Sequence, residues 1–315
     1  MREILTITLN PALDIATSVA QVAPGVKLRC TPPETDPGGG GINVSRAIDQ
    51  LGGQSKCFVA LGGDTGQRLR AQLQQANLDL IIHDAPSETR QSLAVTDLSI
   101  NAQFRFMLPG PDWGAVDIKD ARSAIRAAAP DTGLVVLSGS GPAGAAPDLY
   151  ADICRDFADD ATDIILDTSG PLLAHLAAGQ DSLPLVLRMD QHEAETLARR
   201  PLPTRQDSAN FAETLVKRGA ARMVIVARGA DGSVWADADR RLHVAAADVP
   251  VRSKVGAGDS FVGGFTYAMA RGLGIEQALA HGAAAASAAV MTEGTQLCRA
   301  EDAQNNLAEC VVTPL

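Results

Sequence analysis

The sequence predicts an α/β protein built on a mostly parallel β-sheet. From residue 115 onward, apolar strand-like segments alternate with amphipathic helix-like segments, which is the pattern of βαβ units in a doubly wound sheet. Strand-like segments at 16–33 and 91–108 fall outside this alternation and predict a second, small sheet. The segments after the strands are rich in Gly, Asp and Ser, as expected where a parallel sheet binds ligands at the carboxyl ends of its strands.

The elements of the first third follow from alternation and helical periodicity. Residues 4–9 alternate and are β-branched, which predicts the first strand. Strand-like pieces at 16–22 and 27–33 are separated by a Pro-Gly turn, and helical periodicity runs from Ile42 to the glycines at 52–53. Further strands are expected at 56–63, 78–84, 91–98 and 103–110, and a further helix at 66–77.

The rest of the chain follows the regular alternation. Strands are expected at 133–139, 162–170, 183–189, 222–229 and near 232–246. Helices are expected at 115–129, 145–160, 205–219, 258–271, 275–291 and from about 301, with one more short helix before 183. The strand ends that we expect to form ligand loops are 10–14, 61–64, 138–144, 166–170, 188–193 and 227–232.

Size and composition limit the class of protein. The 315 residues are 46% hydrophobic and 20% charged, enough for one large α/β domain with a small accessory sheet. A net charge of −10 argues against a nucleic-acid or anionic-membrane partner. The five cysteines show no C-x-x-C spacing, and the N-terminus does not have the pattern of a signal peptide. These features favour a cytoplasmic protein without a disulfide framework or zinc site.

Four consecutive glycines, Gly38 to Gly41, lead directly into the helix expected from Ile42. Ordering glycine costs roughly 0.5–1 kcal/mol per residue relative to alanine, so the run needs a physical reason. One reason is a ligand loop at a helix N-terminus, whose free N–H groups suit an anion. The other is a plain structural turn.

A second glycine loop, in KVGAGDSFVGGF at 254–265, precedes another expected helix. Asp259 falls in the first turn of that helix, where a bound anion would have a carboxylate beside it. The alternative is that Asp259 only caps the helix. The dinucleotide motif G-x-G-x-x-G is absent after the first strand, and no G-K-[ST] follows either loop, so dehydrogenase and P-loop functions are disfavoured.

The two glycine motifs, in this order and spacing, resemble the two signatures of the ribokinase-like, or PfkB, family of carbohydrate kinases. The similarity spans nearly the whole chain, and segments 27–44, 89–95, 104–110 and 294–298 resemble the minor-type 6-phosphofructokinases of bacteria. The resemblance implies one kinase domain over residues 1–315, a three-layer α/β/α sandwich. It also implies a small β-sheet lid, inserted in that domain from about 15–34 and 89–108.

The resemblance also implies roles for the sugar-side residues. Asp259 matches the catalytic base, and Gly256, Ala257 and Gly258 match the anion hole for the γ-phosphoryl group. The positions that match sugar contacts are Asp14, Gly39, Asn43 and Ser138. The positions that match cations holding the substrate's own phosphate are Lys27, Arg90 and Arg105, all in the expected small sheet. Singly, each of these three would be an ordinary solvated surface cation, but together they could converge on one dianion.

The nucleotide side departs from the family pattern. The resemblance implies that ATP is bound around Arg188, Asp190, Arg228, Gly229 and Gly232, and Mg²⁺ by Asp190 and Glu193. Asp190 stands where the family has Asn, and Ala227 replaces the usual Ser or Thr, for which the neighbouring Arg228 is expected to compensate electrostatically. The alternative for Asp190 and Glu193 is that they are carboxylates at a helix start.

The implied reaction is ATP-dependent phosphorylation of a ketohexose phosphate. Family members that act on fructose 1-phosphate or tagatose 6-phosphate carry a lysine where this chain has Gly40, so fructose 6-phosphate, phosphorylated at its C1 hydroxyl, is expected. The alternatives are a 1-phosphofructokinase, a tagatose-6-phosphate kinase, and a non-catalytic sugar-phosphate sensor. A homodimer through the lid is also expected, because Ala16, Val19 and Val22 are apolar.

Overall fold

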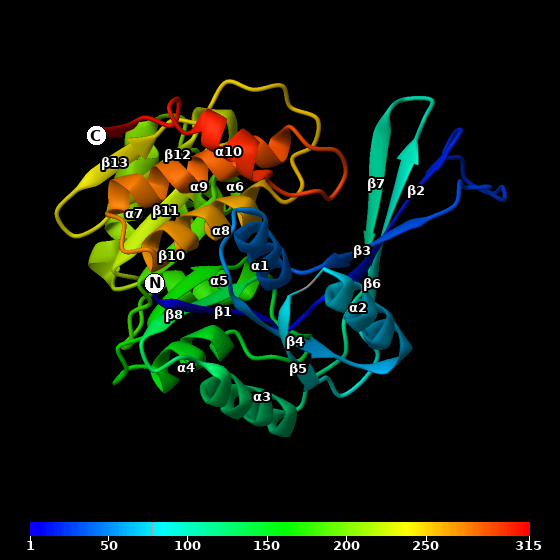
Figure 1. Cartoon of the computed structure of the whole chain (residues 1–315), viewed down its shortest axis with the longest axis horizontal. Helices are drawn as coiled ribbons and strands as arrows, with labels where there is room; N and C mark the ends of the chain where they lie inside the picture. Colours follow the sequence, from blue (N-terminus) through cyan, green and yellow to red (C-terminus); the bar gives the residue numbers. More distant parts are fainter. Residues whose placement is uncertain (77) are drawn as a thin grey trace.

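The main sheet is mostly parallel, as predicted. The computed structural model of the chain describes residues 1–76 and 78–315 (Figure 1). Within them, ten strands pair in the order β14-β13-β12-β11-β10-β9-β8-β1-β4-β5. The parallel strands are β1 (Glu3–Thr8), β4 (Lys56–Leu61), β5 (Asp79–Asp84), β8 (Gly133–Ser138), β9 (Asp163–Asp167), β10 (Val186–Asp190) and β11 (Met223–Ala227). An antiparallel edge follows with β12 (Ser233–Ala236), β13 (Arg241–Val244) and β14 (Val312–Pro314).

Helices cover both faces of this sheet, which confirms the three-layer sandwich. One apolar core joins the sheet to α3 (Ala115–Ala128), α4 (Leu149–Asp156), α5 (Gly170–Ala177), α6 (Gln191–Ala198) and α7 (Arg205–Arg218). The other face is covered by α1 (Gly40–Gln50), α2 (Gly63–Gln75), α8 (Ala257–Ala270), α9 (Ile275–Val290) and α10 (Ala300–Asn306). Figure 1 shows α3 and α4 on the opposite side of β1 and β8 from α1, α8 and α9.

The four-stranded small sheet has the order β3-β2-β6-β7 and stands at one side of the molecule (Figure 1). Its strands are β2 (Ala12–Val19), β3 (Glu34–Gly38), β6 (Arg90–Asp97) and β7 (Ala102–Met107). Only β2 and β6 are parallel. The prediction of a small sheet drawn from two distant segments is therefore confirmed.

Several local predictions were wrong. Residues 27–33 form no strand, since Pro32 and Pro33 lack the N–H groups that a ladder needs, and β3 begins at Glu34 instead. Residues 12–14, expected in a loop after β1, already belong to β2. The segment 188–193, expected as a strand-end loop, contains the start of α6. Asn77, the last residue of the helix expected at 66–77, lies outside the described residues.

The apolar residues expected at a dimer contact are not the exposed ones. Val19 is only 6% exposed, and Ala16 and Val22 are partly buried. Phe104 and Phe106 of β7 are 38% and 51% exposed, on the sheet face opposite to Asp14. Side chains alternate between the two faces of a strand, and this alternation places both rings on the same face. The amino-acid composition of the segment does not show which residues lie on which face.

The structure also describes the state of the cysteines and the character of the helices. The five cysteines are all free thiols. Within residues 1–76 and 78–315, no helix combines the length and the apolar character needed to cross a bilayer.

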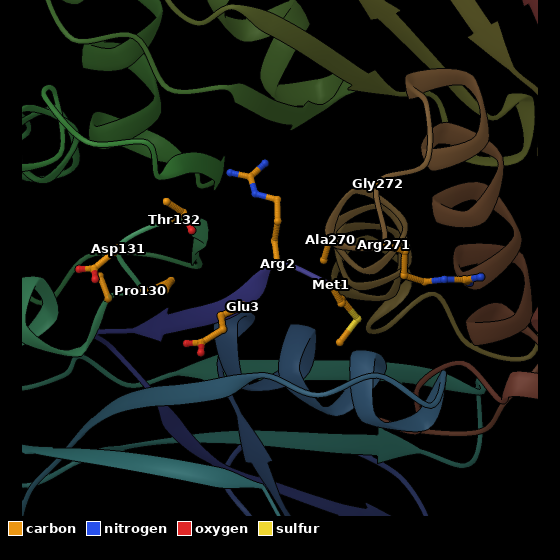
Figure 2. A pocket seen from close by; sticks show the side chains of 10 residues that line it. Met1, Arg2, Glu3, Pro130, Asp131, Thr132, Ala270, Arg271 and Gly272 are labelled. Carbon is orange, nitrogen blue, oxygen red and sulfur yellow. The ribbon is translucent and has the colours of Figure 1, made fainter.

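A cavity of about 770 Å³ opens at the amino ends of β1 and β8, lined by Met1 to Glu3, Ala129 to Thr132 and Ala270 to Gly272 (Figure 2). Ligands of parallel sheets bind at the carboxyl ends, so this cavity lies at the wrong edge for the predicted site. Its Arg2 donates to the carbonyl of Gly133 (2.6 Å) and pairs with Asp163 (2.8 Å). We therefore assign Arg2 a structural role.

Candidate active site

The second glycine loop forms the N-terminus of α8. Gly256 caps the helix with φ 74°, a left-handed conformation that glycine adopts without strain. A Cβ at this position would also collide with the side chain of Leu297. Ala257 and Gly258 open the helix, and the first N–H groups of a helix have no intrahelical partners. The loop therefore presents backbone donors and the positive end of the helix dipole to an anion.

Asp259 is held in the first turn of α8 by a residue of the first glycine motif. Asn43 Nδ2 donates to Asp259 Oδ2 at 2.9 Å, although the two residues are 216 positions apart in sequence. Burial raises the pKa of Asp259 to about 7, and the neighbouring negative charge of Asp167 adds to this. Asn43, Arg188 and Arg46 act in the opposite direction. A carboxylate with a pKa near neutrality suits a general base.

The four glycines let the start of α1 lie directly against the ends of two strands. A Cβ at Gly40 would collide with Ser138 and lie 2.7 Å from the backbone nitrogen of Gly139, just after β8. A Cβ at Gly41 would overlap Ile7 and lie 2.6 Å from Thr8 Oγ1, at the end of β1. Close approach thus gives the run a structural reason of its own, and it also brings Asn43 to Asp259.

This packing predicts the effect of an added methyl group. Gly41→Ala is expected to lower the free energy of unfolding by about 1–3 kcal/mol, because the rigid backbone of β1 must move. Gly274→Ala is the control: Gly274 has φ −67° and open space around its Cβ position, so only the preference of an N-cap for glycine over alanine is lost, and we expect a change below about 1 kcal/mol. Urea unfolding of both variants measures the difference, and equal stability would contradict the close-approach explanation.

The register of the small sheet places three predicted sugar-phosphate residues on one face. Asp14 pairs with Ser92, and Arg105 pairs with Ala94 two positions further along β6, so these side chains and Arg90 share a face. Arg90 is half-buried, and it donates to the carbonyl of Asn10 and to Ser92 Oγ, both at 3.3 Å. Burial raises the pKa of Asp14, whereas its hydrogen bond with Ser92 and the charges of Arg90 and Arg105 oppose that shift.

Lys27 does not take part in this strand register. It lies exposed in the irregular segment between β2 and β3, so its expected place in a strand of the small sheet was wrong. Arg105 is exposed, whereas Ser138 and Gly39 lie at the glycine run, next to Asn43. The structure therefore places two of the three predicted cations on one face of the small sheet.

On the nucleotide side, Asp190 and Glu193 form a reciprocal cap at the start of α6. Glu193 N donates to Asp190 Oδ1, and Asp190 N donates to Glu193 Oε2, both at 2.8 Å. Burial raises the pKa of Glu193, as do the charges of Asp190 and Asp167. In the part of the chain that the structure describes, no group of three or more His, Cys, Asp or Glu side chains could hold a metal ion. The pair fits Mg²⁺ held by one or two carboxylates with water and substrate phosphates.

Arg188 places a buried positive charge below the α8 loop. Its Nη1 donates to both carboxylate oxygens of Asp167, at 2.9 and 3.0 Å, and its guanidinium lies 5.6 Å from the ring centre of Phe261. A Cβ at Gly258 would lie 3.1 Å from Arg188 Nη2. The predicted cation on the nucleotide side is therefore adjacent to the anion loop.

The guanidinium of Arg228 is held by neighbouring groups of the protein. Its Nε donates to Asp231 Oδ2 (2.9 Å), its Nη1 to the carbonyl of Leu202 (3.0 Å) and its Nη2 to that of Pro203 (2.9 Å). Its side chain is 6% exposed. These hydrogen bonds anchor the segment before α7 to Arg228.

The other two residues expected to bind the nucleotide are glycines beside Arg228. Gly229 begins a 3₁₀ turn (Gly229–Asp231), with φ 61° and open space around its Cβ position. Gly232 ends that turn with φ 91°, and a Cβ there would overlap the carbonyl of Val244 and lie 2.8 Å from the backbone nitrogen of Ala246. Gly232 thus has a packing reason of its own, whereas Gly229 is required by the turn.

Two charged residues near Asp259 were not singled out from the sequence. Asp167 lies in the strand-end segment 166–170, which was expected to be functional as a whole. Arg46 follows Asn43 by three positions on α1, a spacing that places both on one helix face. Arg46 could therefore have been predicted from its helical spacing to Asn43 within the glycine motif.

The chain is similar to known carbohydrate kinases along nearly its whole length. The model of the pfkB family of carbohydrate kinases matches residues 7–303. The ATP-dependent 6-phosphofructokinase isozyme 2 of Mycobacterium tuberculosis is 37% identical over 96% of this chain and 88% of its own. That of Escherichia coli is 35% identical over 96% of this chain and 97% of its own. A 1-phosphofructokinase of Xanthomonas campestris is 30% identical over 84% of this chain and 83% of its own.

Solved structures show the same fold. The E. coli phosphofructokinase-2 in complex with fructose-6-phosphate superimposes with a TM-score of 0.89 at 33% identity, covering 98% of this chain and 99% of that one. Another structure of the E. coli protein is of a tetrameric inhibited form. An Arabidopsis thaliana ribokinase matches in fold alone, with a TM-score of 0.78 at 19% identity over 97% of this chain and 98% of that one. This chain has a ribokinase-like fold and belongs to the pfkB family of carbohydrate kinases.

Proposed function

We propose that this chain is an ATP-dependent 6-phosphofructokinase that converts fructose 6-phosphate to fructose 1,6-bisphosphate. The observation that carries the proposal is the contact between Asn43 and Asp259 at the N-terminus of α8, beside the backbone donors of Gly256 to Gly258. A positioned base beside an anion cradle is what phosphoryl transfer to a hydroxyl requires. The two relatives with the highest identities above carry this activity in their names.

In the proposed mechanism, Asp259 accepts a hydrogen bond from the C1 hydroxyl and takes its proton late in the reaction. The C1 oxygen forms a bond to the γ-phosphorus as the bond from that phosphorus to the β,γ-bridging oxygen breaks, and ADP leaves. The transition state is loose, so positioning and charge stabilisation matter more than basicity. The amides of Gly256 to Gly258 and the Arg188 guanidinium would stabilise charge on the transferred group.

Mg²⁺ would be held near Asp190 and Glu193 together with the donor phosphates, where it would neutralise negative charge. Arg188 is fixed beside the same loop by its two hydrogen bonds to Asp167. The capping box uses one oxygen of each carboxylate, which orients both side chains before any ligand binds. This pre-ordering supports a site for the metal–nucleotide complex.

The sugar would lie between the glycine run and the small sheet. Asp14, Gly39, Asn43 and Ser138 are the proposed contacts to its hydroxyls, and Arg90, Arg105 and Lys27 the proposed contacts to its phosphate. We further propose that residues 1–315 form one kinase domain in which the small sheet acts as a lid. A lid that excludes water would limit hydrolysis of the donor.

Fructose 6-phosphate is favoured over the alternative substrates by the packing at Gly40. A Cβ there would collide with Ser138, so this chain has no room for the lysine expected in kinases of fructose 1-phosphate or tagatose 6-phosphate. The alternative of a non-catalytic sensor is disfavoured because the base, its Asn43 partner and the anion loop are all assembled.

We also propose a cytoplasmic homodimer formed through the small sheet. Ile15 pairs with Leu93, and Leu93 pairs with Phe106, so these side chains share the face opposite to Asp14. Two partly exposed aromatic rings, Phe104 and Phe106, make this face apolar. A second copy covering it would remove that surface from water and join two lids.

A coupled assay with ATP and Mg²⁺ tests the function. Fructose 6-phosphate, fructose 1-phosphate and tagatose 6-phosphate are offered separately, and ADP formation without a sugar is subtracted. We expect kcat/KM for fructose 6-phosphate to exceed the other two by at least about 10-fold. Tight binding of fructose 6-phosphate without turnover would instead indicate the sensor.

A further inference from the structure

Arg46 lies one helical turn after Asn43 on α1 and directs its guanidinium at the amide of that residue. Arg46 Nη1 is 3.3 Å from Asn43 Oδ1, and it also reaches the carbonyl of Pro37 at 3.5 Å. Both Arg46 and Asn43 are partly buried. The guanidinium thus contacts the residue that contacts Asp259.

This contact determines which way the Asn43 amide faces. A primary amide has one acceptor oxygen and one donor nitrogen. The cation holds the oxygen, so the nitrogen is directed to Asp259 Oδ2 at 2.9 Å. Rotation of the amide by 180° would bring its oxygen against the carboxylate and its NH₂ group against the guanidinium, two repulsive contacts. Arg46 therefore selects the orientation in which Asn43 donates to Asp259.

The charges around Asp259 give Arg46 a second effect. Asp167 on β9 and Arg188 on β10 face the carboxylate from the sheet, but they are paired with each other by two hydrogen bonds. Arg46 faces it from α1. Among the described residues, Arg46 has no carboxylate within 4.0 Å, and the charges that act on it are those of Asp36 and Asp259. Its positive charge is thus not neutralised by a direct ion pair.

We propose that Arg46 is a positioning residue for phosphoryl transfer, which fixes the amide of Asn43 toward Asp259 and adds a positive charge, beside that of Arg188, that favours the ionised form of this carboxylate. The inference rests on the proposed role of Asp259 as the base. In this proposal the polar side chains of α1 orient the base Asp259 and also contact the sugar. Asp36 on β3 limits the effect of Arg46, and Asp36 Oδ2 in turn accepts from Thr295 Oγ1 at 2.6 Å.

The test compares the pH dependence of kcat in wild type, Arg46→Gln and Arg46→Lys. For wild type we expect kcat to fall as pH drops below about 7, where Asp259 takes up its proton. We call this fall in kcat on the acidic side the acidic limb of the pH profile. In Arg46→Gln the midpoint of the acidic limb should move to a pH about 0.5–1 unit higher. Its kcat defect should therefore be large at pH 6.5 and shrink toward pH 9. Arg46→Lys keeps the charge and should keep the limb of wild type.

Arg70→Gln is the matched control, since Arg70 is exposed on α2, and it should leave both kcat and the limb unchanged. Asp36→Asn leaves Arg46 in place and removes its opposing charge, so the limb should move downward; this variant tests the idea even if Arg46→Gln does not fold. A defect in Arg46→Gln that is independent of pH, an equal upward shift in Arg46→Lys, or an unmoved limb in Asp36→Asn would each overturn the proposal.

A measurement without substrates separates this inference from the proposed function. The carboxyl ¹³C signal of Asp259, identified by its loss in Asp259→Asn, is titrated by NMR in wild type and Arg46→Gln. An upward shift in Arg46→Gln supports the role of Arg46 even if no sugar phosphate is turned over. Identical titrations in an active enzyme would overturn the role of Arg46 and leave the kinase function intact.

Discussion

Asp259→Asn is expected to reduce kcat with fructose 6-phosphate by about 10²-fold or more, the scale for loss of a positioned base. The asparagine oxygen can still accept the hydrogen bond from Asn43, so the fold and the anion loop should persist. KM for fructose 6-phosphate should change by only a few-fold, because the phosphate contacts are untouched. The coupled assay measures both constants.

The control for this variant is Asp64→Asn. Asp64 also lies in the first turn of a helix, α2, but it is exposed. It shares the dipole environment of Asp259 without its chemistry, so we expect kcat within about two-fold of wild type. Near-normal turnover in Asp259→Asn would reject Asp259 as the base.

Asp259→Asn should also stabilise the protein against unfolding at high pH. The pKa of Asp259 is raised from 3.8 to about 7 on folding, so between these values the unfolded chain ionises first and wild-type stability falls as pH rises. The conversion of this shift gives at most about 4 kcal/mol, and because Asp259 is only partly buried, solvent screening reduces it to about 1–2 kcal/mol. Asp259→Asn should therefore gain stability relative to wild type from pH 5 to pH 8 in urea unfolding. If the difference in unfolding free energy between Asp259→Asn and wild type did not change with pH, the raised pKa of Asp259 would be contradicted.

Arg90→Met should lower kcat/KM for fructose 6-phosphate by about 10²-fold, mainly through KM. Arg90 is half-buried and held by the carbonyl of Asn10 and by Ser92, so it is already oriented for a phosphate dianion. Charge-assisted hydrogen bonds to a phosphate are each worth about 1.5–3 kcal/mol. KM for ATP should stay within about two-fold, because the proposed nucleotide site is formed around α6 and α8 and not by the small sheet. Steady-state kinetics with each substrate varied in turn separates these constants.

Arg105→Met provides the comparison. Arg105 is exposed on β7, so it loses more side-chain entropy on binding, and we expect an increase in KM of only about 3- to 10-fold. Equal effects of the two substitutions would show that pre-ordering of Arg90 has no role. An increase in KM for ATP as large as that for the sugar phosphate would place Arg90 on the nucleotide side instead.

Some local predictions failed because tertiary pairing competes with composition. Segment 27–33 reads as a strand by its residue types, but Pro32 and Pro33 and the pairing of Glu34–Gly38 with β2 put the strand later. The contacts of Arg228 with Asp231 and with two carbonyls of the segment before α7 were likewise not predicted. Neither contact can be predicted from a short stretch of sequence, because the pairing partner lies elsewhere in the chain.

The sequence by itself determined the α/β class, the small sheet and the two glycine loops, because periodicity and glycine runs are local signals of local geometry. Only the tertiary structure decided which side chains meet. The contact of Asn43 with Asp259 joins residues 216 positions apart, and the pairing of Arg188 with Asp167 joins two neighbouring strands. The raised pKa of Asp259 likewise arises from burial and from the charge of Asp167, which depend on packing. Burial and charge act through space, so they are set only when distant segments have been brought together.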